Sequence, residues 1–345
     1  MKHDDSSNRL TRRRFLLRGA ATGAATAALA QLREARAAGV GAANPFAYSV
    51  SEFEVTDPAL LKYREVRRFE VPGPEARRLT LLPGGSLLVA AGRRFVEMTA
   101  EGSTVREIAV NGAARCAAVA GDGTVYAGVQ DHVEVFSAKG ERLATWQTPG
   151  KRSWISGLAV GENEVFAADS GARLIWRHDR SGKVTGRIGE RDAARNVPGF
   201  VLPSPFLDVE LAEDGLLRVN NPGRHRVEFY TPAGSLEFAW GEAGMAIDRF
   251  SGCCNPCNLA LLGNGTVITC EKGLPRVKLH GTHGEFEGVV AGTESFPENA
   301  KTGAGDGPGT TNRASLDAVA DATGRIHILD TVTRRVHVME PKQPT

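Results

Sequence analysis

The sequence lacks the short motifs by which many enzymes are recognised. It contains no GxSxG nucleophile elbow, no P-loop and no dinucleotide-binding fingerprint. Its eight histidines are scattered, and no two of them have the HxxxH or HExxH spacing of a zinc site. The sequence therefore offers no recognisable site for hydrolysis, phosphoryl transfer or hydride transfer.

Basic charge is scarce once the N-terminal segment is set aside. Residues 1–37 contain eight of the 42 Lys and Arg residues but only three of the 40 Asp and Glu residues. The rest of the chain therefore carries 34 basic and 37 acidic residues, a formal charge of −3. A surface that binds nucleic acid needs an excess of positive charge, so we expect no nucleic-acid partner.

The N-terminal segment has the pattern of an export signal. Residues 11–16 (TRRRFL) resemble the twin-arginine signal, and an Ala-rich run over residues 19–30 follows. Small residues at 35 and 37 have the spacing that signal peptidase recognises. The alternative is a membrane anchor, which needs about 20 strongly apolar residues, more than this run supplies.

This pattern predicts a location and a set of boundaries. We expect a signal peptide over residues 1–37, recognised by the twin-arginine translocase through Arg12 and Arg13, and a linker over residues 38–60. The expected location is the periplasm or the extracellular space.

Short apolar strands recur along the rest of the chain. The second strand of each repeat begins at Leu87, Val125, Val165, Leu217, Val267 and Ile326. These starts are 38, 40, 52, 50 and 59 residues apart, and the extra length falls in three insertions: residues 190–203, 242–255 and 292–312. A constant core with variable junctions is typical of a fold built from repeated β units.

Six units of about four strands predict an all-β, six-bladed β-propeller over residues 61–341, followed by a tail over residues 342–345. The sixth unit ends after its third strand, near Met339. We expect residues 63–71 to supply the missing outer strand. This pairing would join the two ends of the chain and close the ring.

Parts of the repeats are similar to the NHL repeat. Residues 215–221, residues 226–229 and Gly234 have its strand and turn pattern, and Asp169 and Asp330 match its strand-ending aspartate. The resemblance covers about residues 60–340 and is clearest in the third to sixth units. It implies an NHL-like propeller. NHL propellers mostly serve as binding platforms and a minority are enzymes, so the resemblance implies fold more than activity.

The repeat alignment places two sets of residues at one rim of the propeller. The first set lies at the start of the first strands, nearest the axis: Arg78, Cys116, Ser156, Asp208, Asn258 and Asp317. The second set ends the antiparallel second strands at the same rim: Ala91, Val129, Asp169, Asn221, Glu271 and Asp330. Converging polar groups predict a site for a small-molecule ligand or a protein partner. The alternative is that the aspartates and asparagines cap turns.

Four of the five cysteines gather in the fifth unit. Cys253, Cys254 and Cys257 precede or open its first strand and Cys270 ends its second strand, so we expect all four at the same rim. A disulfide from Cys270 to one of the other three suits an oxidising compartment. A metal site for Zn²⁺, Cu⁺ or an iron centre is the second interpretation. The third is a reactive thiol beside Lys272, whose charge lowers a thiol pKa.

Two classes of function remain open. The first is a non-catalytic platform whose rim engages a ligand or a protein. The second is a metal- or thiol-dependent envelope enzyme that uses Cys253, Cys254, Cys257 and Cys270.

The export signal can be tested directly. Replacing Arg12 and Arg13 by Lys keeps the charge but removes the paired guanidinium groups, so we expect the protein to accumulate in the cytoplasm. Immunoblotting of cell fractions measures the distribution, and normal export of the variant would contradict the prediction.

Overall fold

The computed structural model describes residues 49–303 and 314–343. Arg12, Arg13 and the predicted signal peptide lie outside these residues. The chain divides into two units, Met1–Val50 and Ser51–Thr345, and all of the strands belong to the second. Within the described ranges, no helix has the length and apolar character needed to cross a membrane.

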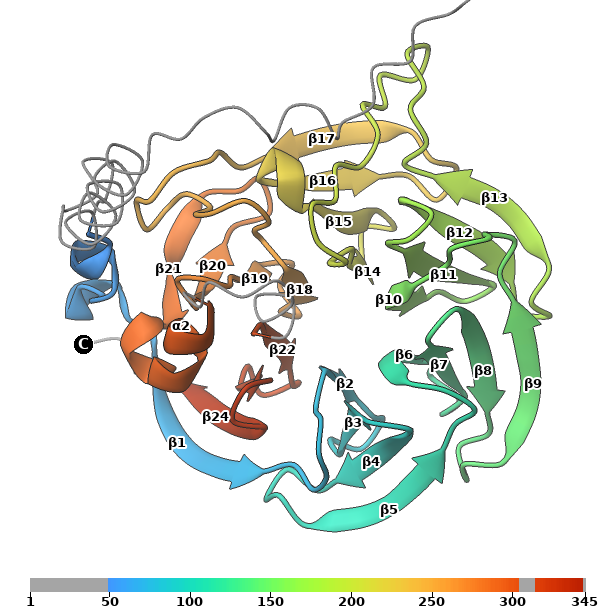
Figure 1. Ribbon diagram of the computed structural model, residues 1–345, viewed down its shortest axis with the longest axis horizontal. Helices are drawn as coiled ribbons and strands as arrows, with labels where there is room; N and C mark the ends of the chain where they lie inside the picture. Colours follow the sequence, from blue (N-terminus) through green and yellow to red (C-terminus); the bar gives the residue numbers. More distant parts are fainter. Residues whose placement is uncertain (1–48, 304–313, 344–345) are drawn as a thin grey trace, which may run out of the picture. The chain divides into compact units, whose positions relative to one another are not determined.

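Six four-stranded antiparallel sheets surround a central axis (Figure 1). In five of them the strands follow chain order from the axis outward. The prediction of a six-bladed β-propeller is therefore confirmed.

The first three blades each consist of four consecutive strands without a long insertion. Blade one contains β2 (Arg78–Leu81), β3 (Leu87–Ala91), β4 (Arg94–Met98) and β5 (Thr104–Ala109). Blade two contains β6 (Ala114–Val119), β7 (Val125–Val129), β8 (His132–Phe136) and β9 (Arg142–Gln147). Blade three contains β10 (Ile155–Val160), β11 (Glu164–Asp169), β12 (Leu174–Asp179) and β13 (Val184–Ile188).

The other three blades carry the insertions. Blade four contains β14 (Val209–Leu211), β15 (Leu217–Asn221), β16 (Arg226–Tyr230) and β17 (Leu236–Trp240). Blade five contains β18 (Asn258–Leu261), β19 (Val267–Cys270), β20 (Val277–His280) and β21 (Phe286–Ala291). Blade six contains β22 (Leu316–Ala320), β23 (Ile326–Asp330), β24 (Arg335–Pro341) and β1 (Tyr63–Glu70).

The ends of the propeller meet in blade six. β1 pairs with β24 in antiparallel register from Tyr63 opposite Pro341 to Glu70 opposite Arg335. His337 Nδ1 also lies 2.8 Å from the Glu65 carboxylate across this seam. The predicted closure by an N-terminal strand is confirmed, and it covers the edge that β24 would otherwise expose.

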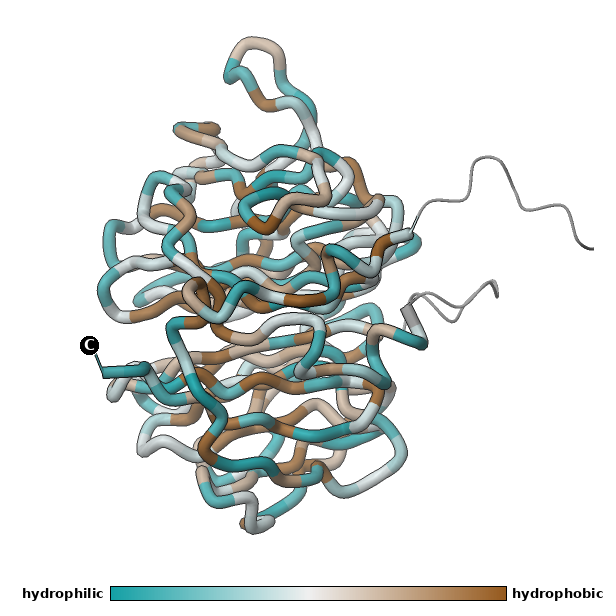
Figure 2. The backbone as a smooth tube through the Cα atoms, turned by 90° about the vertical axis from the view of Figure 1, so that its left-hand side faces the viewer, coloured by the Kyte–Doolittle hydropathy of each residue, from teal (hydrophilic) through white to brown (hydrophobic). Residues whose placement is uncertain are grey.

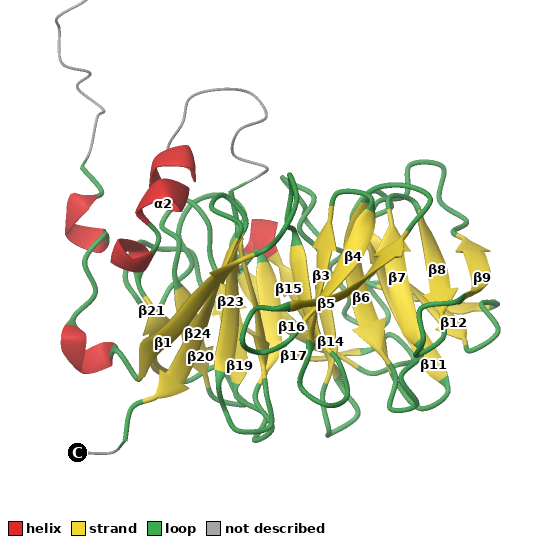
Figure 3. Cartoon of the chain, turned by 90° about the horizontal axis from the view of Figure 1, so that it is seen from below, coloured by secondary structure: helices red, strands yellow, loops and turns green. Residues whose placement is uncertain are grey.

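Among the described residues, helical structure is limited to short segments before β1 and between the strands. The single turns are η2 (Ser51–Phe53), η3 (Pro58–Leu60), η4 (Pro222–Arg224) and η5 (Thr293–Ser295), and α2 covers Pro297–Gly303. In the side view of Figure 3, α2 lies beyond one end of the strands.

Burial explains why the second strands and the outer strands differ in their pattern of apolar residues. Every residue of β3, β7, β15, β19 and β23 is buried, because the second strand of a blade is covered by neighbouring blades on both faces. The outer strands β5 and β9 instead expose three or more of their six residues. Figure 2 shows hydrophobic stretches along the strands and hydrophilic residues at many of the turns.

A recurring contact between neighbouring blades places a glycine of one blade against an aromatic ring of the other. Gly182 has a φ of +92°, and a Cβ added there would lie 2.4 Å from the ring of Trp146 in the preceding blade. Gly284 has a φ of +93° and the same relation to Trp240. Only glycine accepts both the left-handed backbone and the close ring, so these hairpins fix how adjacent blades pack.

The seam between β1 and β24 has a testable consequence. A chain that starts at Ser51 keeps β1, whereas one that starts at Gly73 leaves β24 as an open edge and removes the buried Tyr63 and Val71. We expect the second truncation to lower the melting temperature and to aggregate, and the first to match the full chain. Thermal denaturation with light scattering measures both, and equal stability of the two truncations would contradict the importance of the seam.

Candidate functional site at the axis

Arg78 lies at the centre of the first predicted set. Its Nη2 donates to both carboxylate oxygens of Asp208, at 2.9 and 2.8 Å. Its Nε forms an ion pair with Asp317 Oδ1 at 3.0 Å, and its Nη1 donates to Asn258 Oδ1 at 2.7 Å. One guanidinium from blade one therefore binds side chains of blades four, five and six.

The same set also binds backbone groups of the next blade around the axis. Asp208 accepts from the amide of Leu259, Asn258 donates to the carbonyl of Leu316, and Asp317 accepts from the amide of Leu79. Ser156 Oγ donates to the carbonyl of Leu207 at 2.8 Å. These bonds run in one direction from blade three through blade six to blade one, and we call them the axial network.

Burial controls the charge of the axial network. Burial raises the pKa of Asp317 to about 7 against the opposing charge of Arg78, and Asp208 adds to the rise. Burial, followed by the charge of Asp208, also raises the pKa of Glu210 well above its usual range. Arg78 thus faces the carboxyl groups of Asp208 and Asp317 in a largely buried site, where the ion pairs offset part of the cost of burying the charges.

The register of the strands corrects one position of the predicted set. In β6 and β10 one extra residue interrupts the pairing: Cys116 lies opposite Gly128, and Gly157 lies opposite Ala168. The equivalent of Cys116 is therefore Gly157, and Ser156 is equivalent to Arg115. A Cβ on Gly157 would lie 2.7 Å from Asp208 Oδ1, so the absent side chain leaves room for that carboxylate.

These bulges explain why sequence reasoning missed Arg115. A bulge adds an unpaired residue and redirects its side chain. The repeat alignment takes one position from each first strand, so it selected the buried Cys116 and passed over the unpaired Arg115 directly before it. The only available signal was the placement of Arg115 directly beside an aligned rim position.

The polar members of the second set are buried and bonded to the protein. Asp169 Oδ1 accepts from the amides of Trp154 and Ala172, and its Oδ2 accepts from the indole of Trp176. Asp169 therefore fixes the loop that carries Trp154. The other two positions, Ala91 and Val129, are buried apolar residues.

The remaining three members hold the three insertions. Asn221 accepts from the amide of Val201 and donates to the carbonyl of Gly199. Glu271 accepts from the amide and hydroxyl of Ser251 and forms ion pairs with Arg276 and Lys278. Asp330 accepts from Asn299 of α2 and from the amide of Val332. This geometry favours the turn-capping interpretation for the second set.

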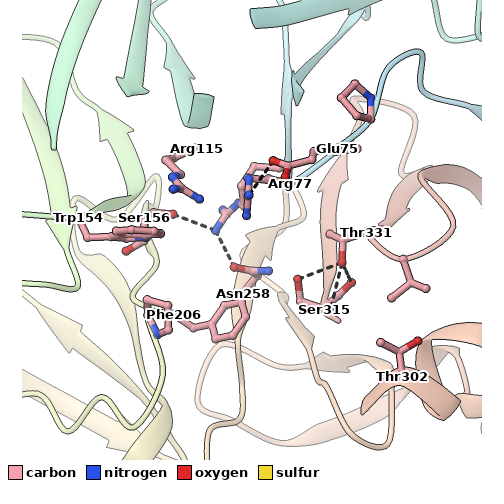
Figure 4. Close-up of a pocket in the computed structure, with 15 residues that line it drawn as sticks. Glu75, Arg77, Arg115, Trp154, Ser156, Phe206, Asn258, Thr302, Ser315 and Thr331 are labelled. Carbon is pink, nitrogen blue, oxygen red and sulfur yellow. Dashed lines mark hydrogen bonds and ion pairs between the residues drawn. The ribbon is translucent and has the colours of Figure 1, made fainter. Parts of the chain in front are cut away.

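A pocket of about 330 Å³ opens at the rim above the axial network. Its lining includes Arg78, Ser156 and Asn258 of the first set, together with Arg77, Arg115 and Trp154. Phe206 from the loop before β14 and Thr302 of α2 complete opposite walls (Figure 4). Residues from all six blades or their connecting loops meet here.

Positive charge predominates in the pocket. Arg77 pairs with Glu75 at 2.7 Å, and among the described residues Glu75 is the only carboxylate of the lining. Arg115 lies with its guanidinium carbon 3.9 Å from the ring centroid of Trp154 (Figure 4). Burial, followed by the charge of Arg77, lowers the pKa of Arg115 to about 10. Its Nε is buried without a hydrogen-bond partner in the described part of the chain.

The cysteines do not form the predicted disulfide or metal site. All five are free thiols. No group of three or more Cys, His, Asp or Glu side chains suited to a metal ion occurs among residues 49–303 and 314–343. Cys270 is fully buried, and the Cys257 thiol donates to the carbonyl of Cys270 rather than to a sulfur. Only Cys253 and Cys254 have sulfurs in contact, at 3.1 Å.

Comparison with known proteins shows the fold. No protein-family model and no curated protein matches the sequence. A streptogramin B lyase matches 80% of this chain and 97% of its own, with a TM-score of 0.54 at 12% identity. A catalytically inactive virginiamycin B lyase from Staphylococcus aureus, solved with quinupristin, matches 79% of this chain and 82% of its own, with a TM-score of 0.54 at 12% identity. At this level of identity the likeness shows a shared propeller architecture.

The axial network predicts a strong effect of losing its cation. Replacing Arg78 by Met leaves Asp208 and Asp317 buried without their partner, so we expect a loss of about 3–5 kcal/mol in the free energy of unfolding. Replacing the exposed Arg64, which pairs with Glu340, is the control and is expected to cost less than about 1 kcal/mol. Urea denaturation measures both, and similar costs would contradict the central role of Arg78.

The pH dependence of that variant follows from Asp317. A carboxyl with a raised pKa in the folded protein holds a proton that the unfolded chain releases, and removing Arg78 raises that pKa further. The destabilisation of the Met variant is therefore expected to shrink as the pH falls from the alkaline side to about 7, where Asp317 of the unmodified protein also takes up its proton. Repeating the denaturation across this range tests the sign.

Proposed function

We propose that this protein is a binding protein whose axial pocket takes a small organic anion with a flat ring. The observation that carries this proposal is the state of Arg115. Its guanidinium lies over Trp154, and its Nε is buried without a hydrogen-bond partner among the residues that the structure describes. A carboxylate or a phosphate supplies the oxygen atoms that such a group lacks.

The size and walls of the pocket support a small ligand. A volume of about 330 Å³ falls at the lower end of ordinary ligand sites. Trp154 and Phe206 provide flat apolar surfaces, and Asn258 and Thr302 provide polar groups. A ring would stack between the aromatic walls while its anionic group faces the arginines.

The lining favours binding over catalysis. Glu75 is the only carboxylate that the described part of the chain adds to the lining, and that group is already paired with Arg77. The four clustered cysteines do not line this pocket. The lyases named above share the fold at 12% identity, so their activities carry no weight for this chain.

The location of the protein is also a proposal. The twin-arginine motif supports export by the translocase to the periplasm or the outside of the cell, and the strand pattern supports an NHL-like repeat. An exported pocket of this kind would meet small organic acids as solutes. A protein partner at the same rim is the alternative occupant.

Replacing Arg115 by Gln tests the proposal. Loss of a charge-assisted hydrogen bond costs about 1.5–3 kcal/mol, so we expect binding of an aromatic carboxylate to weaken roughly 10- to 100-fold. Isothermal titration with a panel of aromatic carboxylates and their neutral amides measures this, and the amides are expected to bind weakly.

Arg180 provides the matched control. Its guanidinium also lies over an aromatic ring, that of Tyr126 at 5.2 Å, but it does not line the pocket. Arg180→Gln is expected to leave the affinity unchanged. Equal binding of acids and amides, or an unaffected Arg115→Gln variant, would rule out anion recognition at this site.

A further inference from the structure

Two adjacent cysteines lie beside the pocket with their sulfurs in contact. Cys253 Sγ and Cys254 Sγ are 3.1 Å apart, about 1 Å more than a disulfide bond. Cys253 is exposed, whereas Cys254 is 2% exposed. An outside reagent therefore meets Cys253 first, and Cys254 lies directly behind it.

The surroundings of Cys254 stabilise a thiolate. Burial acts to raise the pKa of Cys254, but the hydroxyl of Ser204, the thiol of Cys253 and the charge of Lys272 outweigh it and lower the pKa. Ser204 Oγ is buried and has no hydrogen-bond partner of normal geometry within residues 49–303 and 314–343. Its hydroxyl is thus available to a sulfur anion. The hydrogen bond with Cys254, followed by burial, raises the pKa of Cys253.

The loop that carries the pair is held at several points. Asn255 donates to the carbonyls of Ser251 and Lys272 and accepts from the amide of Lys272. His225 Nε2 lies 2.7 Å from the carbonyl oxygen of Gly252. These bonds fix the backbone on both sides of the two cysteines, so the sulfurs are presented together.

The other two cysteines of the cluster are inert by comparison. Burial raises the pKa of Cys257 to about 12 and that of Cys270 well above its usual range. Both have no exposed surface. Buried thiols of this kind are neither nucleophilic nor accessible.

We propose that Cys253 and Cys254 form a thiol–disulfide exchange site for small-molecule disulfides and thiols. Cys253, after losing its proton, attacks a disulfide RSSR, forms a mixed disulfide and releases one thiolate RS⁻. The Cys254 thiolate then attacks Cys253 Sγ and releases the second RS⁻. The two cysteines lose two electrons and two protons, and RSSR becomes two RSH.

The reverse reaction uses the same asymmetry. An incoming thiolate attacks the exposed Cys253, and Cys254 leaves as a thiolate stabilised by Lys272 and Ser204. A thiol with a lowered pKa is the better leaving group. Adjacent Cα atoms are about 3.8 Å apart, closer than the usual 4.4–6.8 Å of bridged cysteines, so the bond is strained and readily reduced.

The site adjoins the pocket wall. Ser204 directly precedes Pro205 and Phe206, both of which line the pocket. Lys272 Nζ lies 5.1 Å from the ring centroid of Phe206. The exchange chemistry nevertheless stands on the two sulfurs and their surroundings and does not depend on which ligand the pocket takes.

The experiment equilibrates the purified full chain in buffers of reduced and oxidised glutathione. Free thiols are then alkylated, and the masses of the fragments are measured. Trypsin cuts after Arg249 and Lys272 and leaves all four clustered cysteines on one peptide, so fragment ions between Cys254 and Cys257 are needed. We expect a loss of two hydrogens confined to Cys253 and Cys254, reversed by reduced glutathione.

Three variants separate the roles. Cys254→Ser is expected to accumulate a glutathione adduct on Cys253, because the second attack is lost. Cys257→Ser is the matched control and is expected to oxidise as the unmodified protein does. Lys272→Met is expected to slow exchange about threefold for each unit by which the pKa of Cys254 rises, given a Brønsted coefficient of about 0.4–0.5.

A reagent for paired thiols gives a second measurement on the unmodified protein. Phenylarsine oxide is expected to bind the reduced chain at Cys253 and Cys254 and to be excluded after oxidation. The proposal fails if oxidised glutathione leaves both cysteines reduced, or if the new disulfide includes Cys257 or Cys270. It also fails if the arsenical reacts equally before and after oxidation.

Discussion

The ion pairs of one largely buried cation at the axis are the interactions on which the inner strands depend. Each blade of a propeller contacts mainly its neighbours, so nothing in the repeat itself specifies how far apart opposite blades lie. Arg78 supplies that constraint, because its donors bind Asp208, Asn258 and Asp317 from three other blades. The cost of burying this charge is offset only while all of the partners are present.

Two groups of interactions build the pocket. The first is the axial network, and the second is the set of residues at the ends of the second strands that bind the connecting loops. The network forms its floor and uses polar residues at the start of the first strands. Residues at the end of the second strands, such as Asp169 and Asp330, hold the loops that form the walls of the pocket. Strands thus set the position of the site, and loops set its chemistry.

The sequence was informative wherever structure repeats. Six strand units and the closing role of residues 63–71 followed from periodicity, and so did the convergence of Arg78 with Asp208, Asn258 and Asp317. Arg115 was missed because it is the extra, unpaired residue of a bulge, and a bulge leaves no mark in the spacing of the strands.

The environment of each cysteine in the cluster was also not predictable from the sequence. Proximity along the chain places four cysteines in one blade, but it does not distinguish the exposed Cys253 from the buried Cys257 and Cys270. That distinction depends on how the insertion over residues 242–255 packs. Glu271 and Asn255 hold this insertion through contacts with no periodic pattern.

The seam in blade six also fixes the order in which the ring can assemble. Five blades are made of strands consecutive in the chain, so each can form as a local meander while the chain is still growing. Glu65 and His337, by contrast, are 272 residues apart, and Asp317 of the axial network belongs to the same last blade. β1 therefore has no strand to pair with until β24 has been synthesised. Closure of the ring and neutralisation of its axis are completed together, in one long-range step at the end of folding.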